Sequence, residues 1–114
     1  MSKEIVVLDV DDAHAAQLSR NYPFYTQFPI PAGSYRGQTG PIKTVAVKAT
    51  FIVSPKISEN TVYQLTKALF ENKAQITTAH AKGAELSTAY AVDGISVPFH
   101  PGAAKYFRKV GAMK

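Results

Sequence analysis

The sequence predicts a mixed α/β protein with few strands and several helices packed on them. Three observations favour this class. A short run of mostly β-branched residues, 5–8, is typical of a buried strand. Apolar side chains on one face alternate with mixed ones over residues 43–53, which indicates a second strand. Beyond Ser58, apolar residues recur at three- and four-residue spacing, which indicates helices.

Length and composition limit the classes of protein that need to be considered. The chain has 114 residues, the usual size of one domain, so we expect a single compact unit. Apolar residues make up 46% and charged residues 18%, which is not the composition of a disordered chain. Cysteine is absent, which excludes disulfides, thiolate nucleophiles and cysteine metal sites. The apolar run at residues 5–8 is too short for the core of a signal peptide, so we expect no export signal in this chain.

The first elements are predicted to be a parallel strand and a helix. Residues 5–8 form the strand, which in an α/β setting is buried on both faces. Asp11 or Asp12 then caps a helix over residues 13–20, which ends on Arg20 as the helix dipole prefers. Asn21 is the expected stop.

Residues 22–41 are predicted to form a rigid, aromatic-rich loop. Prolines at 23, 29 and 31 exclude a helix and favour an extended path, and glycines at 33, 37 and 40 supply turns. Tyrosines with polar tips near glycine and glutamine are typical of a cleft that orients a small polar ligand. Packing of these rings in the core is the alternative. The candidate ligand-binding residues are Tyr22, Tyr25, Tyr35 and Gln38.

The segment 43–53 is the clearest strand in the sequence. Eleven residues exceed the usual strand length of about 5 to 6, so we expect it to cross between two structural regions. Helices follow. Ser58 caps one over residues 59–73, a looser one spans 75–80, Ser87 caps a third over 88–92, and a last one spans 102–110 behind Pro101.

No motif in the sequence predicts an enzyme or a metal site. His14, His80 and His100 lie in separate segments, so structural roles are expected, with His100 placed to cap the last helix or to contact an anion. The acids Asp9, Asp11 and Asp12 lack the glycine and late glutamate of a calcium loop, which favours capping. Glycine-rich phosphate loops and a nucleophile elbow are absent. We therefore expect no catalytic residues and no cofactor.

Five segments, in this order and spacing, resemble the C-terminal part of the TAXI-type solute-binding proteins of TRAP transporters. They are YPFY (22–25), IPAGSYRGQ (30–38), KTVAVKA (43–49), KALFEN (67–72) and VPFHPGA (97–103) with Tyr106. The resemblance covers nearly the whole chain. It implies a type II periplasmic-binding-protein fold, the class that includes the NMT1/THI5-like proteins. Lys48 and Ala81 depart from the family pattern, which tends to have proline there.

The resemblance implies an extracytoplasmic, two-lobed receptor that holds a small carboxylate or amino acid, such as glutamate, and delivers it to a membrane permease. It assigns residues 1–42 to the second lobe, 43–53 to a hinge-crossing strand and 54–114 to the helical C-terminal part of the first lobe. Family members are longer, so we expect a C-terminal fragment that does not bind ligand alone.

Two other hypotheses remain open from the residues. Uncovered sheet edges and helix faces would favour a self-associating module, such as a homo-oligomer. The net charge of +5 would suit a nucleic-acid-binding domain. The basic residues are scattered along the chain, whereas nucleic-acid interfaces gather them on one face, so we expect no nucleic-acid partner.

Overall fold

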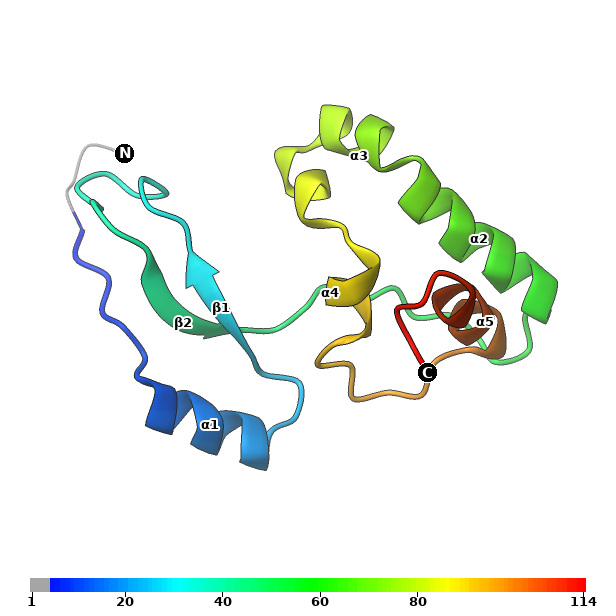
Figure 1. The fold of residues 1–114 in the computed structure, drawn as a ribbon, viewed down its shortest axis with the longest axis horizontal. Helices are drawn as coiled ribbons and strands as arrows, with labels where there is room; N and C mark the ends of the chain where they lie inside the picture. Colours follow the sequence, from blue (N-terminus) through cyan, green and yellow to red (C-terminus); the bar gives the residue numbers. More distant parts are fainter. Residues whose placement is uncertain (1–4) are drawn as a thin grey trace. The chain divides into compact units, whose positions relative to one another are not determined.

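The computed structural model describes residues 5–114, which form an N-terminal and a C-terminal compact unit that divide between Ala49 and Thr50 (Figure 1). The sequence led us to expect one unit. The N-terminal unit contains α1 (Asp12–Asn21), β1 (Thr26–Ile30) and β2 (Ile42–Ala46). The C-terminal unit contains α2 (Glu59–Glu71), α3 (Lys73–Ala79), the 3-10 helix η1 (Ala81–Glu85), α4 (Thr88–Val92) and α5 (Pro101–Lys109). The predicted mixed α/β class is confirmed.

The sheet of the N-terminal unit is an antiparallel hairpin of β1 and β2, with Thr26 opposite Ala46 and Ile30 opposite Ile42. The prediction of a loop throughout residues 22–41 is therefore wrong at β1. Pro29 fits this strand because it lies opposite Lys43, whose N–H and C=O both point to the segment before α1. That position needs no N–H from its partner on β1.

The predicted strand at residues 5–8 is wrong. This segment is not a strand, although it lies beside the segment leading into β2 (Figure 1). The chain contacts β2 just after this segment, where the Val10 N–H donates to the Lys43 carbonyl at 2.9 Å. Val6 and Leu8 are 88% and 80% exposed. A run of β-branched residues becomes a strand only when a ladder of partners and a covered face are present.

The predicted eleven-residue strand is also wrong beyond Ala46, where β2 ends. Its register explains the difference. β1 begins at Thr26, which lies opposite Ala46, so β1 has no residue to pair with position 47. Phe51 and Ile52 are 81% and 82% exposed. Residues 47–53 have the alternating pattern of a strand, but β1 does not extend far enough to pair with them.

The C-terminal unit is built on the contact between α2 and α5. Gly102 lets the two helices approach closely, and the rings of Phe70, Tyr106 and Phe107 pack on one another, with Phe70 and Tyr106 stacked at 5.8 Å between centroids. Two of these rings are buried, since Tyr106 and Phe107 are only 6% and 5% exposed. This aromatic cluster is the main core of the described chain.

The helix predictions of this unit are largely confirmed. The Ser58 and Ser87 side chains cap α2 and α4 by accepting backbone N–H bonds at 3.1 Å from Thr61 and Tyr90. α2 ends at Glu71, so the predicted stretch to residue 73 is broken at Asn72, and α3 starts two residues earlier than predicted. η1 was not predicted. Within residues 5–114, every helix is too short or too polar to span a bilayer.

Candidate functional site

The four predicted ligand-binding residues lie in the N-terminal unit, in two separate places. Tyr22 and Tyr25 lie between α1 and β1, and Tyr35 and Gln38 lie in the loop between β1 and β2. The five residues of β1 separate the two pairs, which corresponds to roughly 17 Å of strand. The structure therefore does not bring all four side chains together within this unit.

The first place is a cluster of three rings. Tyr22 and Tyr25 lie 6.2 Å apart between centroids in an edge-on arrangement, and Phe24 lies 5.0 Å from Tyr25. The backbone here is held by Ser19, whose hydroxyl donates to the Tyr25 carbonyl at 3.0 Å. Tyr22 remains 51% exposed. The cluster thus combines packing between its rings with two rings, Tyr22 and Phe24, that are exposed.

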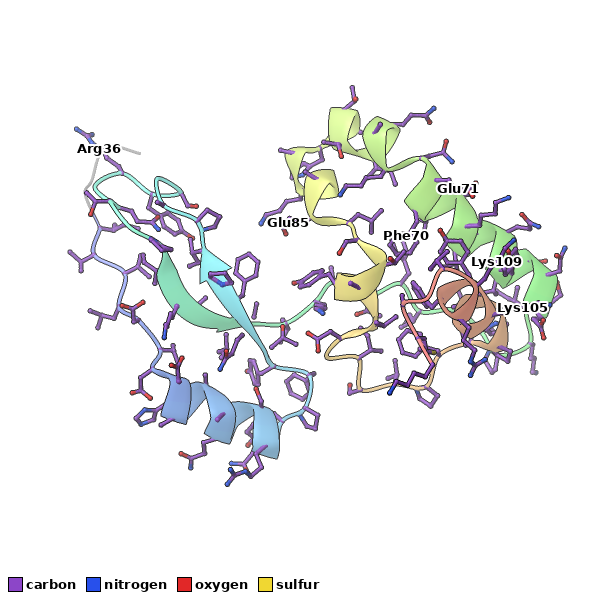
Figure 2. The ribbon with its side chains drawn as sticks, viewed as in Figure 1. Arg36, Phe70, Glu71, Glu85, Lys105 and Lys109 are labelled. Carbon is purple, nitrogen blue, oxygen red and sulfur yellow. The ribbon has the colours of Figure 1, made fainter. Side chains whose placement is uncertain are left out.

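The second place is the loop from Pro31 to Pro41. Gly33 and Gly37 have positive φ angles of 74° and 87°, which side chains with a Cβ avoid, so they make its two sharp turns. The Tyr35 side chain is 44% exposed. Arg36 lies at the tip of this loop (Figure 2).

Gln38 holds the loop from inside. Its amide nitrogen lies 2.7 Å from the carbonyl oxygen of Gly40, 2.9 Å from that of Pro31 and 3.4 Å from that of Ile30. Its amide oxygen accepts from the Tyr35 N–H at 3.1 Å. Both ends of the amide are therefore engaged by the loop itself.

An open hollow of about 240 Å³ lies beside this loop. Tyr35 and Gln38 both line it. The other lining residues are Ile5, Val6, Val7, Gly37, Thr39, Gly40, Pro41 and Ile42. Small-molecule sites usually measure about 300 to 1,000 Å³ and enclose most of the ligand. This hollow can therefore contact one side of a ligand.

A second hollow, of about 420 Å³, lies where α1 faces the hairpin. Asp12 and Lys43 line it and form an ion pair of 3.0 Å at its edge. Both side chains are about two-thirds exposed or more, so the pair adds little to stability. Sequence reasoning missed Lys43, whose backbone N–H also donates to the Asp9 carboxylate, because no local pattern links residues 34 positions apart.

At the start of α1, the side chains of Asp11 and His14 contact each other. Asp11 caps this helix, as predicted for Asp11 or Asp12. Its carboxylate accepts from the His14 backbone N–H at 2.9 Å and lies 2.7 Å from the His14 ring nitrogen. The backbone hydrogen bond, followed by the bond to the ring, lowers the pKa of Asp11. The expected capping role is thus confirmed for Asp11, whereas the carboxylates of Asp9 and Asp12 contact Lys43 instead.

The other histidines also act at helix starts. His100 caps α5, as predicted, since its Nδ1 accepts from the Gly102 N–H at 3.2 Å while Nε2 lies 3.1 Å from the Ile57 carbonyl. His80 accepts from the Lys82 N–H in the same way. Within the described residues, His, Asp and Glu side chains form no group of three or more that could hold a metal.

The described residues of the N-terminal unit combine two open hollows with the exposed tyrosines Tyr22 and Tyr35, a combination that suits a binding protein. The family model of the NMT1-like family matches residues 1–111, and the chain belongs to this family. This is a family of solute-binding proteins, so the fold is of the periplasmic-binding-protein type.

Proposed function

We propose that this chain is part of an extracytoplasmic TAXI-type receptor that binds a small carboxylate and delivers it to a TRAP permease. Membership of a solute-binding family supports the receptor role. The five segments resembling TAXI proteins support the narrower assignment. The observation that carries the proposal is the internally clamped loop, which presents the half-exposed Tyr35 beside an open hollow.

We further propose that residues 43–53 form the hinge between lobes, with residues 1–42 in the second lobe and 54–114 in the first. The boundary between the two compact units, at Ala49 and Thr50, falls inside this segment. A hinge needs a few residues that can change their backbone angles. The absence of strand pairing beyond Ala46 supports that role for residues 47–53.

Among the candidate residues, we propose that Tyr35 contacts the ligand through its hydroxyl and ring. Tyr22 and Tyr25 would contact it only where another part of the receptor closes over their cluster. Gln38 would act indirectly. A tyrosine hydroxyl can donate to a carboxylate, and the exposed ring gives area at a small cost in conformational entropy.

The test is calorimetric titration of L-glutamate into a receptor that contains this chain. Tyr35→Ala should weaken binding roughly tenfold, as loss of one hydrogen bond to a charged group predicts. Gln64→Ala, an exposed change on α2, is the matched control and should leave affinity unchanged. Equal affinity of the Tyr35→Ala and control receptors would remove Tyr35 from the site, and no binding of any small carboxylate would reject the proposed function.

Self-association is the second candidate, and one observation favours it. Val47, Phe51 and Ile52 are 60%, 81% and 82% exposed in a segment whose residues favour strands. Large exposed apolar side chains of this kind promote contacts between copies. Sedimentation of the isolated chain should then show concentration-dependent dimers that Phe51→Lys abolishes. A monomer at all concentrations would reject this candidate.

A further inference from the structure

We propose that Gln38 is a positioning residue that fixes Tyr35 for ligand binding and does not itself contact the ligand. This inference rests on the proposed function, since it assigns a role within the same site. By residue type, Gln38 looks like a ligand-binding side chain. Its hydrogen bonds indicate a different use.

The hydrogen-bonding groups of the Gln38 amide are engaged by the loop itself. A glutamine side chain offers two N–H donors and one acceptor oxygen. Three backbone carbonyls, from Ile30, Pro31 and Gly40, surround the nitrogen of Gln38, and the Tyr35 N–H occupies its oxygen. Rotating the amide by half a turn would place oxygen against three carbonyl oxygens, so its orientation is fixed. Both donors are committed to the loop, and only oxygen lone-pair capacity is left for a ligand.

Gln38 is hydrogen-bonded directly to the backbone of Tyr35. The Tyr35 N–H donates to the Gln38 side chain at 3.1 Å, and the Gln38 N–H donates to the Tyr35 carbonyl, also at 3.1 Å. One residue therefore holds both polar groups of the Tyr35 backbone. Gln38 also accepts the Gly33 N–H on its carbonyl at 3.3 Å, which ties in the first glycine turn.

Gln38 takes part in most of the hydrogen bonds described for this loop. Hairpin loops are commonly two to five residues long, whereas residues 31–41 separate β1 from β2 here. All of them are exposed except Gln38 and Gly40, which are half-buried. A loop without a buried apolar side chain depends on its hydrogen bonds for a single conformation. Gln38 supplies most of them.

A direct test uses the fact that the chain has no tryptophan. Tyr35→Trp makes position 35 the only indole, whose fluorescence anisotropy reports how firmly the position is held. Adding Gln38→Ala should lower that anisotropy toward the value of an unfolded peptide. The matched control, Gln27→Ala, removes an exposed glutamine from β1 and should leave it unchanged. Equal anisotropy in the Gln38→Ala and control proteins would overturn the proposal.

Gln38→Glu separates loss of the clamp from general unfolding. The carboxylate keeps an acceptor for the Tyr35 N–H but sets a negative oxygen against three carbonyls. Protonation restores one donor, so anisotropy should recover as the pH falls through the pKa of the introduced carboxyl, which the three carbonyls would raise above the ordinary value of about 4.3. The parent Tyr35→Trp protein should show no such step. A flat profile for both proteins would contradict the clamp even if Gln38→Ala failed to fold.

A double-mutant cycle on the receptor tests the ligand claim with L-glutamate as probe. If Gln38 acts through Tyr35, Gln38→Ala weakens binding several-fold alone and has no further effect in the Tyr35→Ala background. Independent, multiplying losses would show that Gln38 contacts the ligand and would overturn the proposal. Failure of the parent receptor to bind glutamate would count against the proposed function, while the anisotropy measurements would still decide whether Gln38 fixes position 35.

Discussion

Gly102 of α5 lies so close to α2 that a Cβ atom at position 102 would fall 2.7 Å from the Tyr63 backbone nitrogen. Real Cβ atoms do not approach backbone this closely, so the two helices could not keep their separation with any larger residue. The stability of the C-terminal unit should therefore be sensitive to this one position.

Gly102→Ala is expected to destabilise the C-terminal unit by about 1 to 3 kcal/mol, the usual cost of overpacking, despite the better helix propensity of alanine. Gly40→Ala is the control, because a Cβ there would meet nothing within 4 Å. Denaturant titration followed by the amide resonances of α2 and α5 measures the difference. Equal midpoints for the two variants would show that the helices separate at no cost.

Ser58→Ala is expected to destabilise α2 by about 1 kcal/mol, because the Thr61 N–H loses the oxygen that caps it. Ser96→Ala, at an exposed serine outside any helix, is the control. The same denaturant titration reads out both variants. A Ser58→Ala midpoint equal to the control would mean that water replaces the cap without loss.

The pKa of Glu59 is lowered because its carboxylate accepts a hydrogen bond of 2.7 Å from Lys105, which also attracts it as an opposite charge. A lowered carboxyl pKa stabilises the fold fully above the unfolded value of 4.5, and the contribution is lost as the pH falls through the folded value. Lys105→Met should therefore raise the Glu59 pKa toward 4.5, as NMR titration of the side-chain carboxyl would show.

The control for that titration is Lys67→Met, since Lys67 pairs with Glu71 at 3.8 Å and not with Glu59. The effect of Lys105→Met should shrink in high salt, because both partners are exposed and salt screens them. An unmoved Glu59 pKa in Lys105→Met would show that the pair does not form in solution.

The hairpin should tolerate proline only at positions that make no hydrogen bond between β1 and β2. Pro29 lies opposite Lys43 at a site that makes no ladder hydrogen bond, whereas Phe28 and Thr44 face each other at the neighbouring hydrogen-bonded site. Thr44→Pro should therefore abolish the hairpin, seen as loss of the amide protection of β2, while Pro29→Ala should keep it. Retained protection in Thr44→Pro would show that the register differs from the one described.

The helices were predictable from sequence because their signals are local. Ser58, Ser87 and His100 each cap through a bond to a residue two or three positions further on, which a linear pattern can reveal. The strands were harder, because pairing decides them. Pro29 argued against a strand that exists, and the pattern beyond Ala46 argued for one that lacks a partner on β1.

The candidate site also could be predicted where its signals are local and could not where they depend on pairing. Tyrosine and glutamine in a glycine- and proline-rich loop could be selected from the sequence as candidate site residues. The grouping of the four residues was not, because it depends on β1 lying between them. The use of Gln38 was hidden as well, since its partners Ile30 and Pro31 are eight and seven residues earlier in the chain.

The unequal cores of the two units have a consequence for how the chain comes apart. Of the buried apolar residues between positions 5 and 114, Val62, Ala104, Tyr106 and Phe107 belong to the C-terminal unit, and Ala15 alone belongs to the N-terminal unit. Mild denaturant should therefore produce a half-folded species in which the aromatic core persists and the hairpin has melted. Proteases acting on that species should leave a resistant C-terminal piece.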